Sequence, residues 1–108
     1  MIIAAHAAAP TCPRCNTSVR SGVEIQAAAA DLAEFRAAIQ PLATSPNEDE
    51  RDLHETALLV IAHRHRELHA ELAGEHLDCS ARNHDDSFVA LVLRIAADHA
   101  AAANPVLS

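Results

Sequence analysis

Two of the three cysteines in this chain form the tetrapeptide Cys12-Pro13-Arg14-Cys15. The two intervening residues let both thiolates reach one tetrahedral metal ion at about 2.3 Å each. The turn between them can also offer backbone N–H groups to the sulfurs. A pair of thiolates fills only half of a tetrahedral site, so the other ligands must come from elsewhere in the chain.

A second pair of metal-binding residues, His76 and Cys79, lies downstream with the same spacing. Residues three positions apart share one face of a helix, so on a helix these two side chains could bind the same ion. Together the two pairs make a set of three cysteines and one histidine, which is typical of structural zinc sites and here uses every cysteine of the chain. We therefore predict a structural Zn²⁺ site formed by Cys12, Cys15, His76 and Cys79.

Some sixty residues separate the two pairs, far more than in compact zinc fingers. If a long helix folds back on the preceding one, position 76 lies about 18 Å beyond the start of the first helix. An extended arm of about six residues covers that distance. A rival set stays open, because His65 and His69 are spaced i, i+4 on one helix face and lie nearer to that start. With Cys12 and Cys15 they would make a site of two cysteines and two histidines.

The elements that must position these ligands are helices. Apolar residues recur at steps of three and four over 23–40, which predicts a helix ending at Pro41. The residues before it, 1–22, contain prolines and the CxxC tetrapeptide and are expected to form an irregular arm.

The next helix has the clearest start signal in the chain. Ser45 is placed to be its N-cap, Pro46 its first helical residue, and Glu48 the partner in a capping box. We expect about thirty residues of helix, ending near Gly74. Its expected apolar seam has heptad-like spacing and consists of Leu58, Ile61, His65, Leu68 and Leu72.

A last helix is expected to begin within 83–87 and to end near Ala103. Its first half is apolar nearly all round, which is typical of a helix buried on more than one side. In a bundle of only three helices part of that surface would face water, which favours self-association or a protein partner. Five histidines are expected at the surface: His54, His63, His69, His84 and His99.

The amino-acid composition argues against some classes of function. The net charge is −7 and all eight basic charges are arginines, which argues against direct nucleic-acid binding and against adhesion to an anionic membrane. Half of the residues are apolar, but roughly a quarter are alanine and only two are aromatic, so the core is thin and a metal would help to stabilise it. Three cysteines leave one thiol over in a disulfide scaffold, which favours a reducing cytoplasmic setting.

The sequence thus predicts an all-α fold: a single domain over 1–108, with a zinc-knuckle arm at 1–22 and a bundle at 23–108. The bundle consists of a long antiparallel helical hairpin plus a third apolar helix. The expected function is a non-enzymatic module for protein–protein interaction or regulation. A transcription-associated regulator with a zinc knuckle is one alternative. A thiol–disulfide redox protein is the other, although that chemistry normally places the CxxC at a helix N-terminus after a strand.

Overall fold

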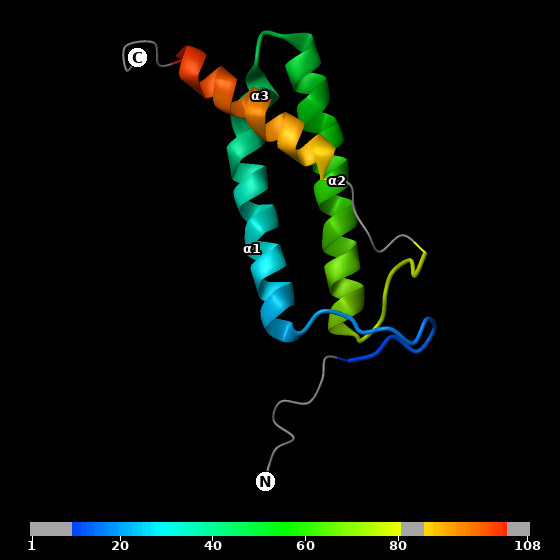
Figure 1. The fold of residues 1–108 in the computed structure, drawn as a ribbon. Helices are drawn as coiled ribbons and strands as arrows, with labels where there is room; N and C mark the ends of the chain where they lie inside the picture. Colours follow the sequence, from blue (N-terminus) through cyan, green and yellow to red (C-terminus); the bar gives the residue numbers. More distant parts are fainter. Residues whose placement is uncertain (1–9, 81–85, 104–108) are drawn as a thin grey trace.

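The computed structural model describes residues 10–80 and 86–103 and contains three α-helices within them. Helices α1 (Gly22–Ile39) and α2 (Glu48–Leu72) form an antiparallel hairpin, and the 3₁₀ helix η2 (Gln40–Thr44) lies between them. Helix α3 (Ser87–Ala103) crosses the hairpin near η2, while the N-terminal arm lies at the opposite end (Figure 1). The predicted all-α bundle with a CxxC arm is confirmed. Within the described residues no helix has the length and apolar character needed to cross a membrane.

Helix α1 begins with a capping box that was not predicted from the sequence. The Ser21 hydroxyl accepts a hydrogen bond from Glu24 N at 3.2 Å, and the Glu24 carboxylate accepts one from Ser21 N at 2.9 Å. These two bonds satisfy N–H groups that a helix start leaves without intrahelical partners. At its other end the expected stop at Pro41 is only partly correct, because the chain continues as η2 through Thr44.

The predicted cap of α2 is wrong by two residues. Asn47, and not Ser45, is the N-cap, and its side chain accepts hydrogen bonds from Asp49 N and Glu50 N. The buried Ser45 hydroxyl instead accepts from Asn47 N at 3.1 Å and donates to Glu50 Oε1 at 2.7 Å. Helix α2 is also shorter than expected, with 25 residues.

His99 was expected at the surface, but it is half-buried and binds Glu50. Its Nδ1 lies 3.0 Å from Glu50 Oε1, the same oxygen that accepts from Ser45. The Ser45 hydrogen bond and His99 lower the pKa of the Glu50 carboxyl. This contact therefore attaches the second half of α3 to the start of α2. His84 lies outside the described residues.

The main core lies where the three helices and η2 meet. Its buried residues come from every one of these elements: Phe35, Ile39, Leu42, Ala57, Ile61, Val92 and Ala96. A smaller cluster between α1 and α2 consists of Ile25, Leu32 and Leu68, with Ala28 and Ala29 packed against it. The apolar core thus becomes thinner from the α3 crossing toward the arm.

The expected seam of α2 is partly wrong. Ile61 and Leu68 are buried as predicted and Leu58 is half-buried, but His65 and Leu72 face solvent. The buried residues of α2 are instead Ala57, Ile61, Glu67, Leu68 and Glu71. His65 lies on the same face of α2 as Ile61 and Leu68 by its spacing, but its side chain is exposed and takes no part in the core.

The core assignment predicts a contrast between two substitutions. Ile39→Ala removes a side chain that is 0% exposed, so we expect a loss of about 2–5 kcal/mol in the free energy of unfolding. Leu72→Ala, at a position that is 66% exposed, should change it by less than about 0.5 kcal/mol. Urea unfolding of both variants measures the contrast, and equal losses would contradict this core.

Candidate metal centre

The CxxC pair lies in a short hairpin of the arm. Thr11 and Ser18 form an isolated antiparallel bridge, and Cys12 N donates to Thr17 O at 2.9 Å. The turn closes with Asn16 N donating to Cys12 O at 2.8 Å. Asn16 has a φ of 58°, a left-handed conformation that asparagine tolerates better than most residues. This turn brings both cysteines to one side of the hairpin.

The second pair lies in the loop that follows α2. Gly74 has a φ of 81° and ends the helix, with Gly74 N donating to Glu71 O and Glu75 N donating to Ala70 O. This pairing is a Schellman motif, which reverses the chain direction directly after the helix. His76 and Cys79 are therefore not on a helix, contrary to the geometry expected from their spacing.

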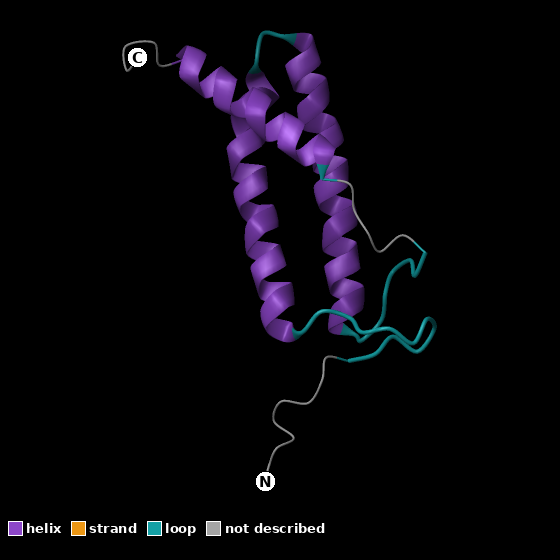
Figure 2. Ribbon diagram, in the orientation of Figure 1, coloured by secondary structure: helices purple, strands orange, loops and turns teal. Residues whose placement is uncertain are grey.

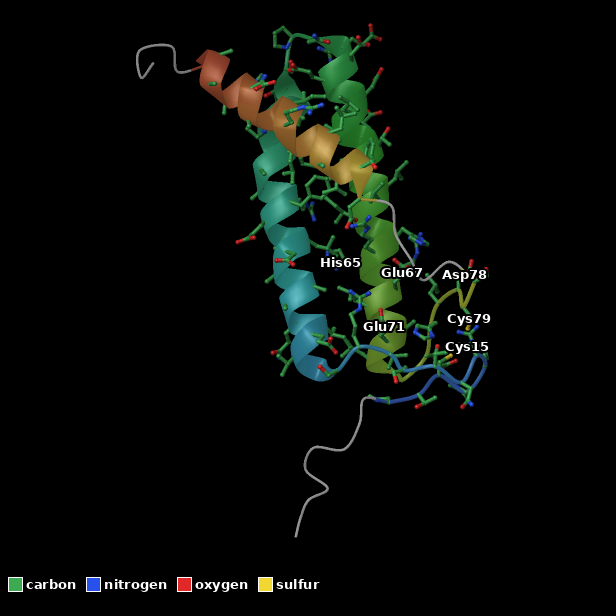
Figure 3. All side chains as sticks on the ribbon, viewed as in Figure 1. Cys15, His65, Glu67, Glu71, Asp78 and Cys79 are labelled. Atoms are coloured by element: carbon green, nitrogen blue, oxygen red, sulfur yellow. The ribbon has the colours of Figure 1, made fainter. Side chains whose placement is uncertain are left out.

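The four predicted ligands meet at the end of the hairpin. One ligand atom from each of Cys12, Cys15, His76 and Cys79 lies within 4.8 Å of the other three. Figure 2 shows the two loops that carry them side by side, and Figure 3 shows Cys15 next to Cys79. The sequence-predicted set is thus one compact group in space. A donor group of three sulfurs and one nitrogen is able to hold a metal ion.

Individual distances fit a tetrahedral ion. The Sγ atoms of Cys12 and Cys79 are 3.8 Å apart, which is about the separation of two sulfurs each 2.3 Å from a tetrahedral zinc. Cys15 Sγ lies 3.2 Å from His76 Nδ1, so Nδ1 is the imidazole atom that faces the group. All three cysteines are free thiols, and 3.8 Å is far too long for a disulfide.

Backbone N–H groups stabilise the first thiolate. Burial alone would raise the pKa of Cys12, but N–H groups of His76, Cys15 and Arg14 donate to its sulfur and lower the pKa to about 5. This confirms the expectation that the turn supplies N–H donors. Such donors favour the thiolate, which is the form that binds metal.

The pKa values of the other three side chains in the group are shifted as well, in different directions. Thr17 lowers the pKa of the Cys15 thiol to about 7, whereas burial and the hydrogen bonds to Cys15 and Cys12 raise that of Cys79 to about 11. Burial lowers the pKa of His76, but its hydrogen bonds to Cys15 and Cys12 outweigh burial, so the pKa is raised. Thiolates this close together need a positive charge beside them, and a metal cation would supply it.

An ion pair next to the group ties the arm to α2. The Glu71 carboxylate, buried near the end of α2, accepts from Arg20 N at 3.0 Å and from Arg20 Nη2 at 2.7 Å. Arg20 Nε also donates to both carboxylate oxygens. Bidentate geometry of this kind is the stronger form of an arginine–carboxylate pair. The pair was not predicted from the sequence, because partners fifty-one residues apart leave no local signal.

The rival histidines are not part of this group. His65 and His69 lie on α2 before its end, and both are exposed. Figure 3 shows His65 well separated from Cys15 and Cys79. Among the described residues the metal-ligand group contains His76 as its only histidine.

Comparisons with protein-family models, with curated proteins and with solved structures give no match for this chain. The geometry of the residues therefore carries the functional argument.

We expect the contribution of the Arg20–Glu71 pair to stability to depend on pH. Burial would raise the pKa of Glu71, but the hydrogen bonds from Arg20 outweigh it and lower the pKa. A carboxyl with a lowered pKa stabilises the fold above its unfolded pKa, and this contribution is lost as pH falls through the folded value. We expect Glu71→Gln to lower the free energy of unfolding by about 2 kcal/mol at pH 7, with the difference shrinking below about pH 4.

Urea unfolding between pH 3 and pH 7 measures this difference. Glu75→Gln is the matched control, since Glu75 is exposed and lies 3.8 Å from a half-exposed Arg14. A pH-independent difference for Glu71→Gln would contradict the assignment.

Proposed function

We propose that this chain is a non-enzymatic helical module with a structural zinc site, which acts through contacts with other protein surfaces. The convergence of Cys12, Cys15, His76 and Cys79 within 4.8 Å carries the proposal. Three sulfurs and one imidazole nitrogen are a typical ligand set of structural zinc. These four residues would fill all four positions of a tetrahedral ion and would leave no open position of the kind that catalytic zinc needs.

The place of the group in the fold supports a structural role. It joins the arm to the loop after α2, where the apolar cluster is small. A cross-link there closes a loop of about sixty residues, which by analogy with a disulfide stabilises the fold by about 4 kcal/mol. The redox alternative lacks its usual structural setting, because the CxxC lies in a hairpin turn and not at a helix N-terminus after a strand.

Metal content tests the proposal first. We expect protein purified without added metal to contain about one zinc per chain, measured by plasma mass spectrometry. Cys79→Ser and His76→Ala should each lose most of the zinc. His65→Ala and His69→Ala are the matched controls and should retain it. Wild-type protein with well under one equivalent of any metal would overturn the proposal.

Chelator treatment tests the structural role separately. Removal of the metal should lower the free energy of unfolding by about 4 kcal/mol. It should also increase the rate of amide hydrogen exchange over 10–20 and 74–80 more than the rate in the core of α3. The double variant Cys12→Ser/Cys15→Ser should respond to chelator hardly at all. If chelator removes the zinc and the free energy of unfolding stays unchanged, the ion does not hold the arm to the loop after α2.

A further inference from the structure

We propose that the outward face of α2 binds a second copy of this chain in antiparallel orientation, with the crossing near Leu59. The proposal rests on the interaction role argued above and names the partner and the surface. It does not depend on the metal centre, which lies at the far end of the hairpin.

The face is a continuous helical stripe on the side of α2 away from the core. Its six exposed residues are spaced at steps of four and three: Glu48, Asp52, Glu55, Leu59, Ala62 and Arg66. This is the heptad spacing through which two helices pack side by side. Leu59, in the middle of the stripe, is 72% exposed, although leucine is an apolar residue and charged residues flank it on the stripe.

A groove beside Leu59 offers a place for an apolar side chain. It has a volume of about 400 Å³ and is lined by Thr56, Leu59, Val60, His63 and Arg64 of α2 and by Phe88 and Val89 of α3. In an antiparallel pair each Leu59 would lie over the groove of the other copy. Thr56 and Ala62 are small, so the two helices can approach closely there.

Charge along the stripe selects the second copy as the occupant. Within the stripe, the charged residues before Leu59 are acidic, whereas Arg66, after it, is basic. Rotation by a two-fold axis near Leu59 places Asp52 of each copy against Arg66 of the other. The same rotation brings Glu55 near His63. A parallel arrangement would instead place acid against acid.

Asp52, Glu55 and Arg66 are available for contacts between copies, whereas His63 Nε2 lies 3.8 Å from Glu67 Oε2 of its own helix. Within residues 10–80 and 86–103, no ion pair involves Asp52, Glu55 or Arg66. Arg64, by contrast, already binds Asp86 at 3.0 Å. Helix α2 is about 37 Å long at 1.5 Å per residue, so the pairing can extend over several turns.

Sedimentation equilibrium of the zinc-loaded chain tests the proposal. We expect a concentration-dependent mass that approaches twice 11.5 kDa. Leu59→Glu should raise the dimer dissociation constant about tenfold or more. Leu72→Glu is the matched control, since Leu72 is an exposed leucine on another face of the same helix, and it should leave the constant unchanged.

A charge swap tests the orientation. Asp52→Arg alone and Arg66→Glu alone should each weaken the dimer, whereas an equimolar mixture of the two variants should associate like the wild type. Asp31→Arg, on the exposed side of α1, controls for the change in net charge. Circular dichroism of each variant verifies that the helices are retained.

A wild-type chain that stays monomeric at all concentrations would overturn the proposal, and so would equal effects of Leu59→Glu and Leu72→Glu. A mixture of the two charge variants that remains monomeric would overturn the antiparallel pairing. Zinc is measured in the same samples. A monomer that holds one zinc would thus contradict the proposed dimer but not the proposed structural zinc site.

Discussion

The meeting of three sulfurs and one imidazole nitrogen within 4.8 Å is the constraint on which the arm end of the molecule depends. Two loops from distant parts of the sequence must be held together there, and closing a long loop costs chain entropy. Apolar packing at this end is limited to Val19 of the arm and the small cluster of Ile25, Leu32 and Leu68. Polar interactions therefore have to help to hold the arm in place.

Two such interactions act side by side. The donor group needs a positive charge among its sulfurs, which a metal cation would supply, and Arg20 supplies one to the buried carboxylate of Glu71. The left-handed turn at Gly74 connects them, because it directs the chain from Glu71 toward His76 within a few residues. A side chain in place of Gly74 would strain that turn, so the helix end and the ligand loop are one structural unit.

Much of this arrangement could be predicted from local sequence patterns. The spacing of Cys12 and Cys15, repeated in His76 and Cys79, identified the four residues that meet, and periodicity identified three helices. The contacts between residues far apart in the sequence could not be predicted. No local pattern indicates that Arg20 pairs with Glu71 or that Glu50 pairs with His99. The prediction that His65 belongs to the buried seam of α2 was wrong, because spacing shows which face of a helix a residue shares and does not show whether its side chain is buried.

Helix α2 takes part in each of these features, which gives it the central place in the molecule. Its inner stripe forms the core with α1 and α3, and its last turn leads into the donor group. Because α3 crosses near one end and the arm is tied to the other, the helix is supported along its length. A surface held rigid in this way loses little conformational entropy on binding. The stripe around Leu59 is thus preorganised, which favours the association proposed above.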